Sequence, residues 1–250
     1  MGSGDRDVRG GGCAAIAIED ALESCAHADD PDFAYDLPYL SSADSIPAMS
    51  KPLLPAIDAA GRLREAAFAL LVRDRSPLGL DDLARLAGLE SGAVGDVTAT
   101  LARAGWLDLD EVGRITGAAG LSLATGAHGL TLGGFPFRTW CAYDALGIAA
   151  ALEAYALVET ACGECGKPIR IEFHGGVPER RGPERLWLAD GGDDLRGSFC
   201  APTVLLCGEA HGAAWAEAQA GRGRLLDLAE GARQGGSAWA GCAEATRKLA

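Results

Sequence analysis

Cysteine is the residue type most suggestive of chemistry in this 250-residue chain. A disulfide framework is typical of short secreted chains, whereas a chain of this length keeps its thiols as small buried side chains or as metal-facing nucleophiles. The positions of the cysteines must therefore decide their role. The eight cysteines are Cys13, Cys25, Cys141, Cys162, Cys165, Cys200, Cys207 and Cys242.

The first candidate cluster is the run from Arg138 to Leu146, which contains Cys141 and Asp144. If a helix begins near Trp140, Cys141 lies in its first turn, where the helix dipole lowers the pKa of a thiol. Asp144 follows three residues later and shares that face of the helix. Such a carboxylate can take the thiol proton and return it later. The alternative is that Cys141 is a small core residue and Asp144 complements the helix dipole.

The second cluster is Cys162-Gly-Glu-Cys165, which has the spacing of half a zinc ribbon. A ribbon needs a second C-x-x-C pair, and Cys200 and Cys207 are seven residues apart. We therefore expect an open, weak site without stoichiometric zinc, although the sequence leaves metal binding by this pair open. In the third cluster, the run from Arg196 to Pro202, Cys200 precedes a predicted strand that ends at Cys207.

Signatures of other enzyme classes are missing from the sequence. It has no G-x-S-x-G elbow, Walker loop, G-x-G-x-x-G turn or H-E-x-x-H helix. The histidines are scattered, so we interpret each as a surface or loop residue rather than a ligand. They are His27, His128, His174 and His211. Thiol chemistry without an organic cofactor is what remains.

The segment 1–52 is predicted to be an acidic, mobile arm. Positions 1–50 hold ten acidic residues and two arginines, a large part of the net charge of −13 of the whole chain. Glycines and prolines interrupt any long periodicity, although 16–25 could form a short helix. No apolar run approaches the roughly 18 residues of a membrane span, and no secretory signal is visible. The sequence thus predicts a cytoplasmic protein without membrane contact.

Residues 53–132 have the layout of a winged helix-turn-helix module. Apolar spacing predicts helices over 63–71, 81–87 and 91–104, and alternating residues over 106–112 and 121–132 predict strands. Positions 59–132 contain nine acidic and seven basic residues, and the third helix has no cation before Arg103. Recognition helices offer cations and amides to DNA, so we expect no nucleic acid partner.

Residues 133–250 are predicted to form an α+β catalytic domain with a small mixed sheet and flanking helices. The expected helices are 140–156, 211–220 and 225–232. The expected strands are 168–173, 185–188 and 202–207. The few aromatic residues, 6% of the chain, indicate small-residue packing rather than an aromatic-lined groove.

Over about 63–215 the sequence resembles the organomercurial lyase (alkylmercury lyase) family. The resemblance rests on the W-C-A-x-D-x-L run at 140–146, on Cys162, on the S-F-C run ending at Cys200, and on their order. It implies that Cys141 and Cys200 are the two catalytic cysteines and Asp144 the catalytic aspartate. It also implies that Cys162 is structural.

The implied reaction is protonolysis of a carbon–mercury bond in an organomercurial substrate. Mercury is soft, and two thiolates suit it well. Asp144 would take a thiol proton and deliver it to the carbon, and Cys141 and Cys200, with Asp144 nearby, would briefly hold the Hg(II) product. Turnover then needs thiol acceptors, such as a mercuric reductase or small thiols, and no cofactor.

The chain departs from the family pattern at three places: Ala201, the added Cys165 and the acidic arm. One alternative is therefore a related enzyme that uses the same trio on another organometal or small molecule. Two others are a metal-responsive winged-helix regulator and a structural zinc module. The sequence does not distinguish alkyl from aryl substrates.

Overall fold

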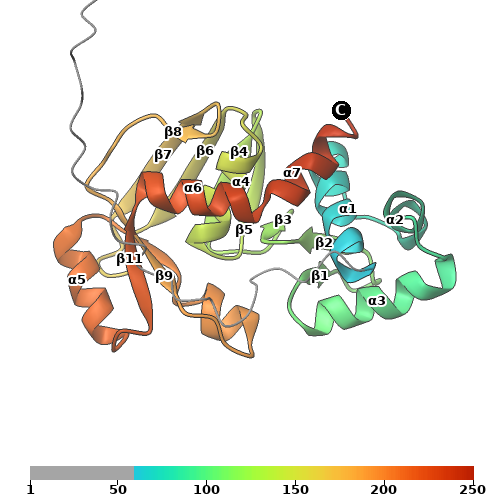
Figure 1. Ribbon diagram of the computed structural model, residues 1–250, viewed down its shortest axis with the longest axis horizontal. Helices are drawn as coiled ribbons and strands as arrows, with labels where there is room; N and C mark the ends of the chain where they lie inside the picture. The colour runs from blue at the N-terminus through green and yellow to red at the C-terminus, as the bar shows by residue number, and fades with distance from the viewer. Residues whose placement is uncertain (1–58) are drawn as a thin grey trace, which may run out of the picture. The chain divides into compact units, whose positions relative to one another are not determined.

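The structure is a computed structural model that describes residues 59–250 (Figure 1). These residues belong to one compact unit of the chain. The predicted acidic arm, 1–52, and the first residues of the predicted 53–132 module lie outside the described residues. No helix between residues 59 and 250 is long and apolar enough to cross a membrane.

Three helices open the described chain in the predicted order. α1 (Ala59–Asp74) buries its apolar stripe, and α2 (Leu80–Ala87) ends at Gly88, whose φ of 63° is the left-handed conformation that glycine adopts easily. α3 (Ser91–Arg103) packs against both α1 and α2. An antiparallel strand pair follows, β1 with β2. The assignment of this region as a winged helix stays a prediction.

A sheet of eight strands forms the centre of the molecule, in the order β1-β2-β3-β5-β4-β6-β7-β8. It runs without interruption across the predicted boundary at 132/133, because β4 pairs with β5 on the other side. The strands are β1 (Leu107–Leu109), β2 (Ile115–Ala118), β3 (Leu121–Ser122), β4 (His128–Leu132), β5 (Phe135–Thr139), β6 (Ala156–Ala161), β7 (Pro168–His174) and β8 (Val177–Pro178).

The predicted small mixed sheet is wrong, since every strand pairing among the described residues is antiparallel. Short hairpin connections such as β4–β5 and β6–β7 enforce this, because only antiparallel neighbours can be joined by a tight turn. The coarser expectation of an α+β fold is confirmed.

Helix α4 (Ala142–Ala151) is buried almost all round and lies between the large sheet and α6 (Leu228–Ala238), as Figure 1 shows. Small residues make this approach possible: a Cβ added at Gly147 would meet the ring of Trp239 at 2.5 Å. α7 (Ala240–Arg247) continues from α6 and packs on α1.

A second sheet has three strands in the order β10-β9-β11 and carries α5 (Glu209–Ala218). The strands are β9 (Arg185–Ala189), β10 (Val204–Leu206) and β11 (Gly223–Asp227). The predicted helix over 225–232 is wrong in its first half, because residues 223–227 pair with β9 along their whole length. A one-turn π-helix, η1 (Leu195–Cys200), links β9 to β10.

Candidate active site

Cys141 and Asp144 together form the N-terminal cap of α4. The Cys141 Sγ accepts a hydrogen bond from the Asp144 N–H at 3.4 Å, and the Asp144 Oδ2 accepts one from the Cys141 N–H at 2.8 Å. This reciprocal arrangement is a capping box with a thiol in place of the usual hydroxyl. The predicted common face is therefore correct, and the backbone of the helix holds both side chains.

Cys200 reaches the same place from the end of η1. The Ala142 N–H donates to the Thr203 carbonyl at 3.3 Å, which ties the segment after Cys200 to the start of α4. The two sulfurs and a carboxylate oxygen of Cys141, Asp144 and Cys200 all lie within 4.8 Å of one another. The structure thus brings together the three residues predicted from the sequence, although Cys200 is 59 positions from Cys141.

Burial controls the electrostatics of this trio. Cys141 has no exposed surface, and Asp144 and Cys200 are only 4% and 5% exposed. Burial raises the pKa of Asp144 to about 6, although hydrogen bonds from Cys141 oppose the shift. Burial, the Cys200 thiol and the Asp144 charge also raise the pKa of Cys141 well above its usual value. The expected lowering by the helix dipole is therefore outweighed, and Cys141 needs a base before it can ionise.

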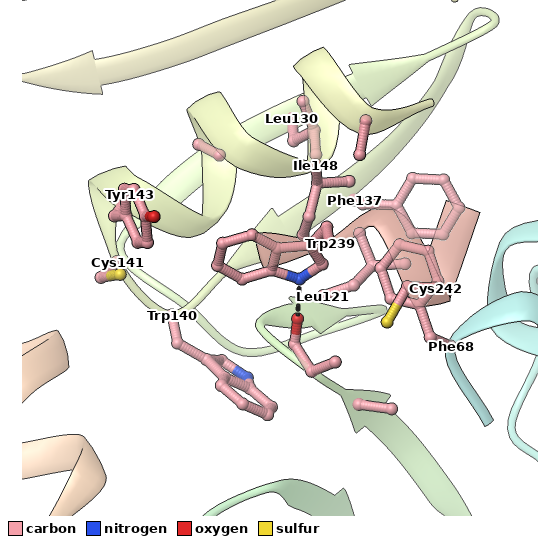
Figure 2. Close-up of a cluster of buried hydrophobic side chains, with 14 of the residues drawn as sticks. Phe68, Leu121, Leu130, Phe137, Trp140, Cys141, Tyr143, Ile148, Trp239 and Cys242 are labelled. Carbon is pink, nitrogen blue, oxygen red and sulfur yellow. Dashed lines mark hydrogen bonds between the residues drawn. The ribbon is translucent and has the colours of Figure 1, made fainter. Parts of the chain in front are cut away.

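A small pocket opens onto Asp144 and Cys200. Figure 2 shows Trp140, Tyr143 and Trp239 around the start of α4, next to Cys141. The Trp239 Nε1 donates to the Ala119 carbonyl at 2.6 Å, so the indole has a fixed orientation. The expectation of no aromatic-lined groove is wrong, because five of the chain's fifteen aromatic residues line this pocket. The aromatic lining is Trp106, Trp140, Tyr143, Phe199 and Trp239.

Arg196 packs on Trp140, which lines this pocket, and no role was predicted for it from the sequence. Its guanidinium lies 3.2 Å from the centroid of the Trp140 ring and binds the Asp108 carboxylate at 2.8 Å. The other Asp108 oxygen accepts from the Trp140 Nε1, also at 2.8 Å. The Arg196 Nε donates to the Gly105 carbonyl at 2.7 Å. This network fixes η1, and thereby Cys200, against the strand β1.

The absence of a side chain at Gly120 leaves room for the carboxyl group of Asp144. The φ of Gly120 is +92°, and a Cβ placed there would lie 2.6 Å from the Asp144 Cγ. The turn between β2 and β3 can therefore approach the carboxyl group only with glycine at this position. The residue is invisible to motif reasoning because its role depends on a contact across the fold.

A second thiol cluster lies at the far end of β10. It contains Cys162 and Cys165 in the β6–β7 turn, Cys207 after β10, and His211 in the first turn of α5. The ligand atoms of the four residues all lie within 4.8 Å of one another. The statement that the C-x-x-C lacks a partner pair is therefore wrong. The neighbouring residues form a C-x-x-x-H pair, and His211, predicted to be a surface or loop residue, lies half-buried in helix α5 as part of this cluster.

The sequence did contain a signal for this second half. Cys207 and His211 are four residues apart around a predicted helix start, and ligand pairs of zinc sites commonly have such a spacing.

The pKa values of two thiols in this cluster are shifted in opposite directions. Burial disfavours ionisation of Cys162, but the N–H groups of Cys165, Cys207 and Glu164 lower the pKa of its thiol to about 6. Partial burial and hydrogen bonds from the Cys207 thiol to the sulfurs of Cys165 and Cys162 raise the pKa of Cys207 to about 11. One thiolate is thus favoured here, and a second is opposed by the first.

Residues 121–241 match the family model described as alkylmercury lyase. A solved structure described as the mercury-bound form of MerB2 is similar to the chain, with a TM-score of 0.65 and 22% sequence identity over 76% of this chain and 93% of that chain. No curated protein matches the chain in sequence. At this identity the structural likeness shows the shared fold, and the family model covers all three positions of the buried trio. The chain therefore carries an alkylmercury lyase domain over residues 121–241.

Proposed function

We propose that this chain cleaves the carbon–mercury bond of organomercurials with Cys141, Asp144 and Cys200. One observation carries the proposal: two thiols and a carboxyl group, all nearly fully buried, meet within 4.8 Å at an aromatic pocket. Thiols bind the soft mercury, and a buried carboxyl group can carry a proton to carbon. No other residues in the described part of the chain combine these features.

The steps balance without an added reagent. The substrate R–Hg–X, with X a thiolate, exchanges X for one cysteine sulfur, and that thiol's proton leaves as HX. The second thiol adds to mercury and gives its proton to the Asp144 carboxylate. The carboxyl proton then moves to the carbon as the carbon–mercury bond breaks. The products are RH and Hg(II) bound by the sulfurs of Cys141 and Cys200.

The shifted pKa values suit these roles. With a pKa of about 6, Asp144 is ionised at neutral pH and can receive a proton, yet it is a much better base than an exposed aspartate. The Cys141 thiol keeps its proton until mercury binds, because its pKa is raised. The proton therefore moves when the metal arrives and not before.

The pocket would hold the organic group. Its lining is almost entirely apolar and aromatic, so the hydrocarbon fragment can leave water while mercury faces the sulfurs. Tyr143 contacts both Phe199 and Trp239 edge to face, at 6.2 and 5.4 Å between ring centroids. Such a lining suits an aryl group at least as well as a short alkyl group.

Hydrocarbon release tests the proposal directly. Purified protein is incubated with phenylmercury and excess thiol, and benzene is measured in the headspace. We expect catalytic release that Cys200→Ser abolishes. Stoichiometric mercury binding without benzene would contradict the proposal and favour a mercury-binding protein.

The proposal extends to partners and setting. Turnover requires a thiol acceptor for Hg(II), either small thiols or a mercuric reductase, and uses no cofactor. All six described cysteines are free thiols, which supports a reducing, cytoplasmic location. The region 53–132 would be a winged-helix-like module that supports the catalytic domain. Its acidic balance makes nucleic acid an unsuitable partner.

A further inference from the structure

We propose that Cys162, Cys165, Cys207 and His211 bind one structural Zn²⁺ ion. Three thiolates and one imidazole are a standard ligand set for structural zinc. The spacing, C-x-x-C followed by C-x-x-x-H, lies within the range that such sites use. This site is separate from the buried trio and has no part in the reaction proposed above.

The distances between the ligand atoms are close to those of a zinc tetrahedron. Zn–S bonds of about 2.3 Å give sulfur–sulfur edges of about 3.8 Å, and sulfur–nitrogen edges of about 3.6 Å. The Cys165 and Cys207 sulfurs are 3.7 Å apart, and the Cys162 Sγ is 3.7 Å from the His211 Nδ1. A third edge, from the Cys207 Sγ to the His211 Nδ1, is short at 3.0 Å. It must lengthen by about half an ångström when a metal replaces the shared proton.

The backbone presents the four ligands from three tightly joined segments. In the β6–β7 turn the Cys162 N–H donates to the Lys167 carbonyl at 2.8 Å, and the Gly166 N–H donates to the Cys162 carbonyl at 2.9 Å. The Gly163 N–H donates to the Leu205 carbonyl at 2.9 Å, which fixes this turn on β10. A Cβ at Gly163 would meet Val204 at 2.7 Å, so the close approach requires glycine.

Backbone donors also prepare the site for thiolates. The Cys207 N–H points at the Cys162 Sγ over 3.4 Å. Hydrogen bonds of this kind offset part of the negative charge of a metal-bound sulfur. Cys207 and His211 flank the N-terminus of α5, where the helix dipole favours anionic ligands as well.

The ligand set favours a held structural ion over a reacting one. Four protein ligands fill a tetrahedron and leave no open position for a substrate. No carboxyl group belongs to the cluster, so it has no proton donor of the kind that Asp144 supplies to the buried trio. The ion would connect the large sheet, through its β6–β7 turn, to the three-stranded sheet and α5.

Metal analysis of the full chain tests the site. The protein is purified without a histidine tag, under reducing conditions, and is then equilibrated with equimolar zinc and desalted. We expect about one zinc per chain in the wild type and near-complete loss in Cys165→Ala and His211→Ala. Cys165 is exposed, so its substitution leaves no buried cavity. The matched control is Cys242→Ala, which removes a buried thiol that belongs to no candidate metal-ligand group and should keep its zinc.

Cobalt exchange gives a second readout that does not depend on activity. Tetrahedral Co(II) bound to thiolates absorbs strongly in the visible, and we expect these bands in the wild type and not in Cys165→Ala. A zinc-free wild type without cobalt bands would overturn the proposal. So would full zinc content in both ligand variants. If the zinc-free chain instead bound two Hg(II) ions, one of them lost in Cys165→Ala, the cluster would be a receiver for the mercury product and not a zinc site.

Discussion

The two thiol clusters are built from the same residue type and differ in what surrounds the sulfur. At the trio, Cys141 and Cys200 are buried beside the carboxyl group of Asp144. The second thiol cluster, called the edge cluster below, consists of Cys162, Cys165, Cys207 and His211. Its Cys165 is exposed, its fourth member is an imidazole, and it contains no carboxyl group. A strand of three residues, β10, separates the two sites along the chain.

The difference shows that the partner groups decide what a thiol does with a metal. Two sulfurs leave mercury coordinatively open to a carbon ligand, and an adjacent acid can break that bond. Three sulfurs and a nitrogen close the coordination shell, so the ion can only be held. Substitutions that act on one cluster and spare the other therefore test the assignment of both.

The largest effect is expected at the sulfurs of the trio. Cys141→Ser and Cys200→Ser should each reduce hydrocarbon release by at least about a thousandfold, because serine is a poor ligand for soft mercury. Cleavage of phenylmercury under excess thiol measures this. Serine at 141 keeps the helix cap, so thermal unfolding should change little.

The control for these variants is Cys242→Ala, which removes a buried thiol that belongs to neither thiol cluster. It should retain turnover close to that of the wild type. If Cys141→Ser or Cys200→Ser keeps wild-type turnover, that sulfur has no role in the reaction, and the contrast between the clusters disappears.

Asp144→Asn should lower the activity and, above the pKa of Asp144, raise the stability of the folded chain. Asparagine can still accept the Cys141 N–H, but it carries no proton to the carbon, so mercury should bind and hydrocarbon should not be released. The folded-state pKa of Asp144 lies above its unfolded value of 3.8, so burial of the ionised group costs stability as the pH rises through about 6.

This penalty is absent from the variant. We expect Asp144→Asn to be more stable than the wild type at pH 8, by up to about 3 kcal/mol, and to match it at pH 4. Denaturant unfolding at the two pH values checks the prediction. Equal stability at pH 8 would show that the carboxylate is not destabilised by its surroundings.

Lowering the pH perturbs Asp144 more mildly than substitution does, because it only protonates the carboxylate. Asp144 must be ionised to receive the thiol proton, so the single-turnover rate should fall about tenfold per unit once the pH drops below about 6. Circular dichroism over the same range controls for unfolding. A rate that stays flat between pH 5 and 8 would assign the proton to another group.

The smallest effect on cleavage is expected at the edge cluster. Cys162→Ala and His211→Ala should lower the free energy of unfolding by about 2 kcal/mol, through lost packing and lost metal. Cleavage per folded molecule should change far less than in Asp144→Asn. Thermal melts with and without a chelator measure the first quantity, and benzene release below the melting range measures the second.

The local sequence was sufficient to predict that Cys141 and Asp144 of the trio lie together. Cys141 and Asp144 are three residues apart on one helix, and such spacing survives any change in the rest of the fold. The catalytic role of Cys200 was implied only by the family resemblance, because nothing in the local sequence predicts that η1 places this residue at the start of α4. The position of Arg196 against Trp140 and Asp108 likewise depends on contacts between residues up to 88 positions apart.

The predictions that proved wrong also failed because contacts between residues far apart in the sequence decide the structure. Residues 223–227 contain Leu225 and Leu226, which suit a helix or a strand, and pairing with β9 decides for the strand. The aromatic pocket was missed because a low aromatic content says nothing about where the rings meet. The ligands Cys207 and His211 lie 42 and 49 residues after their partners in the β6–β7 turn, so only the folded chain shows them as one group.

The capping box at the start of α4 has a consequence for the origin of the activity. A helix that begins with serine and an acid three residues later is among the commonest local structures in proteins. The pair found here differs from it by a single atom, sulfur for oxygen at position 141. An ancestor without any mercury chemistry could thus have held both side chains in their present places, for the sake of the helix alone. One nucleotide change from a serine to a cysteine codon would then supply the first thiol, already positioned beside its acid.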